Sequence, residues 1–375
     1  MNVKTRLVVS IVAVLAVALA GLVTVIAVLT TNQASKDGLR YASSEATSEA
    51  QAIETGLTRQ METAQGLSTV LARTVASGRA DRVLADAIEA DLLAADPTLL
   101  GVWSGFEPNA FDGRDAAHRT DPTSDPSGRY VSYWFRDGDA ISVAPLVDYD
   151  VPGAGDYYLA PFGAGVPVAV EPYPYEVAGE TVMITSLAAP VQVAGTTVGV
   201  AGVDVPLSAV AEQIGAIRPY GEGRAALVSD GGAVVASSRD GDETGAAPAG
   251  AAADLAAEAV DTGELVQRTV DGSVFVAAPI AVAEGQYWAV LVEIPESAIL
   301  ADAHSLRTTI LVGALVTMVI AGLATLLVAR QVVAPLDALR ERMEEIADGD
   351  GGGRLVVELT KEEAGELGRL LTEAA

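Results

Sequence analysis

The sequence predicts an α+β protein: a long N-terminal helix followed by two small modules with antiparallel sheets, flanked by two membrane-spanning helices. Three observations lead to this prediction. Two long runs contain no charged residue, a stretch after the first run repeats apolar residues at helical spacing, and two successive groups of short β-rich segments follow. A chain of 375 residues has room for all of these parts.

The two uncharged runs are residues 7–29 and residues 308–329, which contain 23 and 22 residues. About 20 apolar residues are enough to cross a bilayer as a helix. The apolar region of a secretory signal peptide is shorter, about 7–15 residues, so the first run favours an uncleaved span. Both runs are therefore expected to be transmembrane helices.

Charges beside these runs set the expected orientation. Lys4 and Arg6 precede the first run, and arginines follow the second. The positive-inside rule then places both termini, residues 1–6 and 330–375, in the cytoplasm, and residues 30–307 outside it. We expect a two-pass protein of the cytoplasmic (inner) membrane whose largest part is extracytoplasmic.

The outer segment divides into helices and two groups of strands. Apolar residues recur every three or four positions from Ile53 to Leu71, which predicts a long helix, and a second helical pattern stops before Pro97. A membrane-distal module is expected at about residues 97–206 and a membrane-proximal module at about 218–298. The expected strands are residues 99–103, 140–147, 168–171, 181–193, 196–205, 224–229, 232–237, 264–270, 273–282 and 286–294, with helices at 207–217 and 255–260 and a loop at 241–253.

Composition excludes several classes of function. The formal net charge of −27 argues against nucleic-acid binding, which depends on neutralisation of phosphates by Lys and Arg. The chain has no cysteine and only two histidines, far apart, so neither a zinc site nor a thiol site is expected. Motifs typical of nucleophilic or phosphate-transfer catalysis are missing from the sequence, and we expect no enzyme activity and no cofactor.

Aromatic residues are concentrated in one segment. They make up only 5% of the chain, yet seven of the ten tyrosines lie within residues 130–175, together with Trp134. Several aromatic faces around one space attract an alkylammonium ion, by about 0.5–2 kcal/mol per ring. The alternative is that these tyrosines only pack a sheet, where aromatic residues are favoured.

Asp204 is an acidic residue at the end of an apolar segment, residues 200–205. A partly buried carboxylate needs a cationic or hydrogen-bonding partner, and a ligand amine would provide one. Because Pro206 follows, the carboxylate could instead cap the next helix. The residues alone leave both interpretations open.

The order of these parts resembles the double-Cache sensor family of methyl-accepting chemotaxis receptors. Four segments carry the resemblance, which extends over about residues 33–298: residues 128–134, 155–159, 171–175 and 199–205. It implies two tandem PAS-like (Cache) modules, a small-molecule ligand in the distal module, a homodimer in a bacterial inner membrane, and a downstream signalling domain or kinase complex.

The C-terminal segment resembles a HAMP relay domain. Apolar residues alternate spacings of three and four from Leu336 to Ile346, as in a parallel coiled coil. Pro335 and residues 365–368 carry the resemblance, although the family usually has Asp where Gly365 stands. The domain is expected to be incomplete at residue 375.

The resemblance also implies a ligand class. Amino-acid-binding members hold the ligand carboxylate with an arginine, and Gly155 occupies the corresponding position here. Residues that surround the ligand's amino group in such members are retained, which favours a cationic amine. The expected ligand-binding residues are Trp134, Tyr157, Tyr158, Tyr173 and Tyr175, with Asp204 as the counter-charge.

Three alternatives remain. The chain could be the input half of a sensor histidine kinase or a diguanylate cyclase. The ligand could be an amino acid or an organic acid. Finally, the outer part could be an adhesion module without a ligand.

Overall fold

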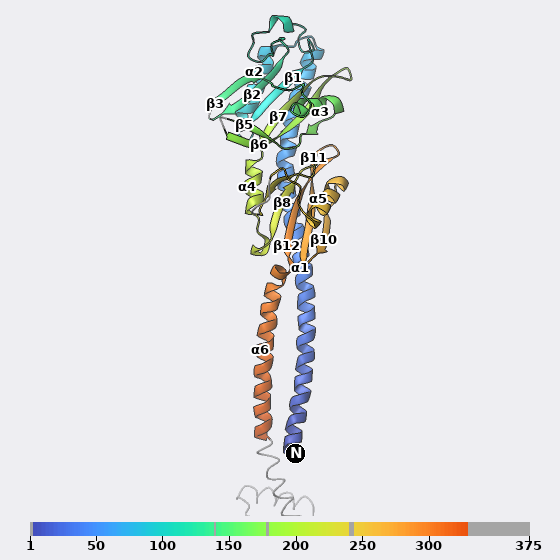
Figure 1. Ribbon diagram of the computed structural model, residues 1–375, viewed down its shortest axis with the longest axis vertical. Helices are drawn as coiled ribbons and strands as arrows, with labels where there is room; N and C mark the ends of the chain where they lie inside the picture. Colours follow the sequence, from blue (N-terminus) through green and yellow to red (C-terminus); the bar gives the residue numbers. More distant parts are fainter. Residues whose placement is uncertain (1–2, 139, 178–179, 240–243, 329–375) are drawn as a thin grey trace, which may run out of the picture. The chain divides into compact units, whose positions relative to one another are not determined.

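The computed structural model describes residues 3–138, 140–177, 180–239 and 244–328 (Figure 1). The expected HAMP domain at residues 330–375, with its coiled-coil seam, lies outside these residues. Val28–His304 form one compact unit, and the described residues before and after it belong to a second unit.

Two helices of the second unit contain the uncharged runs. They are parts of α1 (Val3–Ala76) and α6 (Glu296–Val328). Both helices are long and apolar enough to cross a membrane, and no residue of their most apolar stretches is buried by protein. Lipid covers the side chains of a membrane-spanning helix, so this exposure fits the expected spans. The span limits 7–29 and 308–329 stay predictions.

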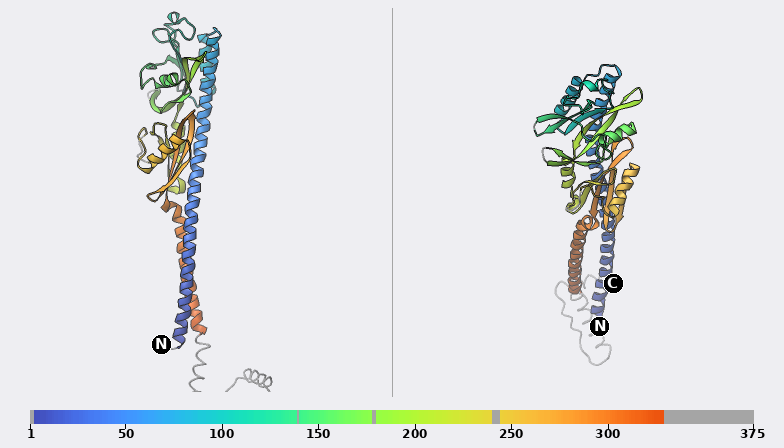
Figure 2. Two further views of the ribbon diagram at one scale, coloured as in Figure 1. Left: turned by 90° about the vertical axis from the view of Figure 1, so that its right-hand side faces the viewer. Right: turned by 45° about the horizontal axis from the view of Figure 1, so that its top comes forward.

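In the larger unit, one face of α1 is buried against both sheets. Figure 2 shows α1 running along one side of the two sheets, and its buried apolar residues belong to the same core as residues from both of them. The spacing of three and four places these residues on one helix face. They are Ala42, Ala46, Ala50, Ile53, Leu57, Met61, Ala64, Leu67 and Leu71.

The distal module is built on an antiparallel sheet of seven strands. Its order is β3-β2-β1-β7-β6-β4, and β5 also pairs with β6. The strands are β1 (Gly101–Phe106), β2 (Val131–Asp137), β3 (Ala140–Pro145), β4 (Val168–Ala169), β5 (Tyr173–Val177), β6 (Glu180–Val193) and β7 (Thr196–Pro206). The helices are α2 (Arg82–Ala95), the short η1 (Asp115–Ala117) and α3 (Asp156–Ala164).

Side chains alternate between the two faces of this sheet. Val102 belongs to the core that contains α1, whereas the next residue, Trp103, belongs to a separate core that includes residues of α3. Successive residues of a strand point to opposite faces, so each strand can serve both cores. The α3 side is rich in aromatic residues, including Tyr133, Tyr149 and Tyr158.

The proximal module has an antiparallel sheet of five strands in the order β10-β11-β12-β8-β9. α1 covers one face of this sheet, and α5 packs on the other. The two-residue turn at Asp271 and Gly272 joins β10 to β11, and both residues have positive φ, as such hairpins require. The elements are α4 (Ser208–Ala216), η2 (Pro219–Gly221), β8 (Arg224–Val228), β9 (Val234–Ser237), α5 (Ala251–Thr262), β10 (Val266–Val270), β11 (Ser273–Ala283) and β12 (Gln286–Pro295).

Most expected elements are found, with four differences. The sequence pattern does not predict β2, β5 or α3, and α5 begins inside the expected loop, at Ala251. β2 and β5 are built from aromatic, charged and proline residues and do not alternate apolar with polar residues. α3 contains Pro161 in its interior, which normally argues against a helix.

Two backbone-directed contacts join the modules. The Gln286 side chain pairs with Ala169: its Oε1 accepts from the Ala169 amide at 3.0 Å, and its Nε2 donates to the carbonyl at 3.4 Å. Glu171 Oε1 accepts a hydrogen bond from the Gly231 amide at 2.7 Å. β4 and the residues before β5 are therefore tied to turns of the proximal module.

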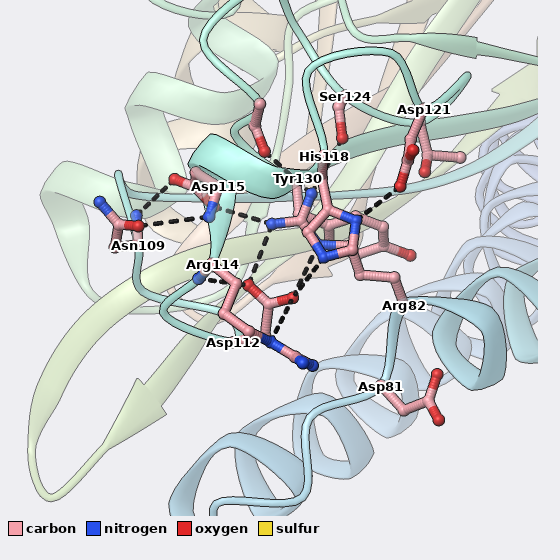
Figure 3. Close-up of polar contacts among 12 residues, drawn as sticks. Asp81, Arg82, Asn109, Asp112, Arg114, Asp115, His118, Asp121, Ser124 and Tyr130 are labelled. Carbon is pink, nitrogen blue, oxygen red and sulfur yellow. Dashed lines mark hydrogen bonds and ion pairs between the residues drawn. The ribbon is translucent and has the colours of Figure 1, made fainter.

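A buried arginine holds the loop at the end of the distal module (Figure 3). Arg82, only 5% exposed, binds both carboxylate oxygens of Asp112 at 3.0 Å and Asp115 at 2.8 Å. It also donates to Ser124 and to the Gly128 carbonyl. Arg82 thus uses several of its N–H donors on groups of this loop. We therefore interpret the cluster as structural: it holds the loop in place.

Candidate ligand-binding site

A cavity of about 420 Å³ lies on the α3 side of the distal sheet. A pocket of this size is in the usual range for a small organic ligand. Six of its lining residues are aromatic: Trp103, Tyr133, Phe135, Tyr157, Tyr173 and Tyr175. Two of its described lining residues are acidic, Asp148 and Asp204, and none of them is basic.

Asp204 lies in β7, lines this cavity and is 4% exposed. Its Oδ1 accepts hydrogen bonds from the Trp103 indole at 3.0 Å and from the Ser186 hydroxyl at 2.7 Å. The hydroxyls of Tyr173 and Ser186 are 2.8 Å apart. Because Ser186 uses its proton on Asp204, Tyr173 must donate to Ser186, which gives a chain of three side chains.

Oδ2, the second carboxylate oxygen of Asp204, lies near Gly101 and the Tyr133 hydroxyl. A Cβ placed on Gly101 would lie 3.1 Å from Oδ2 and 3.0 Å from the Tyr133 hydroxyl. Gly101 pairs with Asp204 in the β1–β7 register, so the missing side chain leaves room for the tyrosine. The Tyr133 hydroxyl is buried and finds no partner of hydrogen-bonding geometry. A polar pair is thus left incompletely satisfied at the cavity wall.

Burial dominates the electrostatics of this site. It raises the pKa of Asp204, although the hydrogen bonds from Ser186 and Trp103 and the nearby Tyr133 hydroxyl act in the opposite direction. Burial, followed by the negative charge of Asp204, also raises the pKa of Tyr133, Tyr157 and Tyr173. The tyrosines therefore remain neutral, and none of the described residues that line the cavity gives Asp204 a positive partner.

Four of the six predicted residues line the cavity: Tyr157, Tyr173, Tyr175 and Asp204. The hydroxyl of Tyr157 donates to the Val147 carbonyl at 2.6 Å, and its ring meets Trp103 edge to face at 5.2 Å between centroids. This contact orients the Tyr157 ring at the cavity wall. The assignment of these four residues as ligand contacts stays a prediction.

The other two predicted residues, Trp134 and Tyr158, lie outside the cavity. Trp134 follows Tyr133 in β2 and therefore packs on the opposite face, against the α1 core. Tyr158 follows Tyr157 in α3, and its hydroxyl donates to Glu107 at 2.7 Å. The Arg129 guanidinium lies 5.4 Å from the Tyr158 ring centroid, so this tyrosine faces a cation of the protein itself.

The sequence interpretation missed Trp103 and Tyr133. Both are in central strands, and the pairing of β1 with β7 brings Trp103 to Asp204 across about 100 residues of chain. The rarity of tryptophan, with three in the chain, is the one signal that could have drawn attention to Trp103. Asp204 does not cap α4, because the N-cap residue is Leu207 and no side chain bonds to that helix end.

Comparison with known proteins agrees with this fold. Residues 89–212 match the family described as methyl-accepting chemotaxis protein-like, first PDC sensor domain. Residues 335–374, beyond the described part of the chain, match a protein family of unknown function (DUF3117). The chain is similar to the methyl-accepting chemotaxis protein TlpQ of Pseudomonas aeruginosa, with 29% identity over 296 residues. That similarity covers 69% of this chain and 40% of the length of TlpQ.

Two solved structures are similar over the same region. The extracellular domain of the putative histidine kinase mmHK1S-Z3 is 30% identical, with 73% of this chain and 99% of that chain covered and a TM-score of 0.61. Methyl-accepting chemotaxis protein X is 27% identical, with coverages of 72% and 98% and a TM-score of 0.54. The resemblance to the double-Cache sensors is thereby confirmed. The chain belongs to the PDC (Cache) sensor family of the methyl-accepting chemotaxis proteins, and its two candidate membrane helices flank that sensor domain.

Proposed function

We propose that this chain is the sensing part of a transmembrane chemoreceptor whose distal module binds a small cationic amine. The observation that carries the proposal is the buried carboxylate of Asp204 in an aromatic cavity whose described lining has no basic side chain. Each aromatic face adds about 0.5–2 kcal/mol of attraction for a cation, and the carboxylate supplies the counter-charge.

The position of Gly155 argues against a ligand held by its carboxylate. A Cβ there would lie 2.3 Å from the Asp148 carbonyl oxygen and 2.6 Å from the Tyr149 carbonyl carbon. Both atoms belong to the backbone, so an arginine would require the loop to move. The lack of space for that cation, together with the buried Asp204 carboxylate, supports an amine as the ligand in preference to an amino acid.

The signal would pass from this module through α1 and α6. Ligand binding shifts an equilibrium between receptor states only if the ligand binds one state more tightly. Helix shifts of about 1–2 Å are typical of such transitions. We propose a homodimer in a bacterial inner membrane, with both termini cytoplasmic, the sensor outside, and a HAMP domain that relays to a kinase complex.

Calorimetric titration of the full chain in lipid nanodiscs tests the ligand class. The probes are n-alkylammonium ions and the n-alcohols and n-carboxylates of matching length. We expect only the ammonium ions to bind. Binding of the carboxylates with failure of every ammonium ion would overturn the proposal in favour of an acid ligand. A thermal-shift screen in which no metabolite stabilises the chain would favour an adhesion module.

A pair of variants locates the binding. Asp204→Asn keeps the size of the side chain but removes its charge, and loss of a buried charge partner costs about 2 kcal/mol or more. The expected loss of affinity is therefore about 30-fold or greater. Asp137→Asn is the matched control, because Asp137 is exposed and is not among the residues that line the cavity. Equal effects of the two substitutions would refute the role of Asp204.

A second candidate is the input half of a sensor histidine kinase. It is favoured by the 30% identity to the extracellular domain of mmHK1S-Z3, which the chain covers almost completely. The gene sequence that follows codon 375 distinguishes the two outputs. A long charged heptad hairpin indicates chemotaxis, and a kinase or cyclase motif indicates the alternative.

A further inference from the structure

The buried carboxylate of Asp204 has no cationic partner among the described residues that line the cavity. Oδ1 accepts from Trp103 and Ser186, whereas the described hydroxyl near Oδ2, that of Tyr133, lacks a hydrogen-bond partner of good geometry. An ionised carboxylate without a cation is expensive to bury, and such a group normally takes up a proton instead. The Tyr133 hydroxyl near Oδ2 acts against this proton uptake, because donation from it favours the ionised form.

Other titratable groups around Asp204 do not compete for this proton. Tyr133 of β2, Tyr157 of α3, and Tyr173 and Tyr175 of β5 face it, and burial raises the pKa of each of them. Trp103 of β1 and Ser186 of β6 do not titrate. Asp148, the other acidic residue of the cavity lining, is exposed to solvent.

We infer that a cationic ligand binds by replacing a proton on Asp204, so that recognition is coupled to proton release. This rests on the proposed function. The exchange balances as a protonated Asp204 plus one ligand cation giving a carboxylate–cation pair plus one proton, which leaves to solvent. The Trp103 and Ser186 hydrogen bonds to Oδ1 are retained throughout, so the side chain need not move.

The coupling gives the receptor a pH response with a definite sign. While Asp204 of the empty site is protonated, affinity for a permanent cation rises about tenfold per pH unit, and it becomes constant once the empty site is ionised. An acidic environment therefore weakens the response, because protons compete with the ligand. A neutral ligand in the same cavity would show no such dependence.

The direct test is calorimetry on the full chain in nanodiscs, with tetramethylammonium and n-butylammonium chlorides as probes. Tetramethylammonium has no ionisable proton, so any proton released comes from the protein. Titrations at one pH in buffers of different ionisation enthalpy give the number of protons released. We expect a value that approaches one per bound cation at acidic pH and falls toward zero at alkaline pH.

Two variants separate this site from other buried acids. Glu89→Gln is the matched control, since Glu89 is fully buried but accepts from Ser104 and Ser132, which belong to the strands' opposite face. It should leave the released protons unchanged, whereas Tyr133→Phe should move the pH dependence to higher pH. Infrared spectra without ligand give a second measurement: the wild-type minus Asp204→Asn difference spectrum should contain the carbonyl band of one buried carboxylic acid, with the Glu89 band cancelled.

The possible failures are distinguishable. If no ammonium ion binds at any pH, the proposed function fails. If ammonium ions bind at Asp204 with an affinity independent of pH and without proton release, the proposed function stands and proton exchange is refuted. Absence of the Asp204 carboxylic acid band at acidic pH would overturn the exchange in either case.

Discussion

Gly101→Ala is expected to disturb the ligand site without removing any polar group. The new Cβ would stand 2.5 Å from the Tyr133 ring carbon Cε2 and 3.1 Å from Asp204 Oδ2. Overpacking of this kind costs about 1–3 kcal/mol. For a domain of roughly 150–250 residues each kcal/mol changes Tm by about 2–4 °C, so a decrease of about 2–12 °C is expected.

The assay combines thermal unfolding with ammonium titration. Tyr133 must move to admit the methyl group, so affinity for the ammonium probe should fall along with Tm. Gly163→Ala is the matched control, because a Cβ there meets no atom within 4 Å and the residue is in α3. The control should leave Tm unchanged or raise it, since Ala favours a helix by about 1 kcal/mol. Unchanged Tm and affinity in Gly101→Ala would refute the close packing of Tyr133 against Asp204.

Three further predictions concern stability, all measured by unfolding of the full chain. Arg82→Ala should destabilise the larger unit by about 3–5 kcal/mol, because it leaves the 2%-exposed Asp112 carboxylate without its partner; a loss below 1 kcal/mol would contradict this account of the loop cluster. Burial raises the pKa of Glu89 well above its usual range, so the folded state holds this proton more tightly than the unfolded state. The wild type therefore loses free energy of unfolding as pH rises above the pKa of Glu89 in the unfolded chain. Glu89→Gln has no such loss, so its stability relative to the wild type should increase from acidic to neutral pH. A stability difference that does not change with pH would refute the raised pKa of Glu89. Gln286→Ala should cost about 1–3 kcal/mol by leaving both polar atoms of the Ala169 backbone without this partner, and an unchanged unfolding profile would show that the contact does not join the modules.

Helices and strands could be predicted from the sequence where the spacing or the type of the apolar residues favours one of them clearly. The stripe from Ile53 to Leu71 and the β-branched segments of β6 and β7 have clear periods, and helix and strands form there. β5, Tyr173–Val177, has no apolar alternation and is a strand because β6 offers it an edge to pair with. Such a pairing is decided by the tertiary structure.

The sequence predicted the type of binding site but only some of the residues that line it. Concentrated tyrosines and an acid at the end of a strand predicted the chemistry of the cavity. Trp134 and Tyr133 are adjacent in β2, so only one of them can face the cavity. Strand register decides which one does, and the sequence pattern did not predict that register. Tyr157 and Tyr158 differ in the same way, by their positions around α3.

A structure of the chain with its tightest-binding ammonium ion would show whether Asp204 is the counter-charge of the ligand. The ligand nitrogen is expected within about 4 Å of Asp204 Oδ2 and within about 6 Å of the Tyr173 and Trp103 ring centroids. A ligand bound outside this cavity, or one that turns its apolar end toward Asp204, would contradict it.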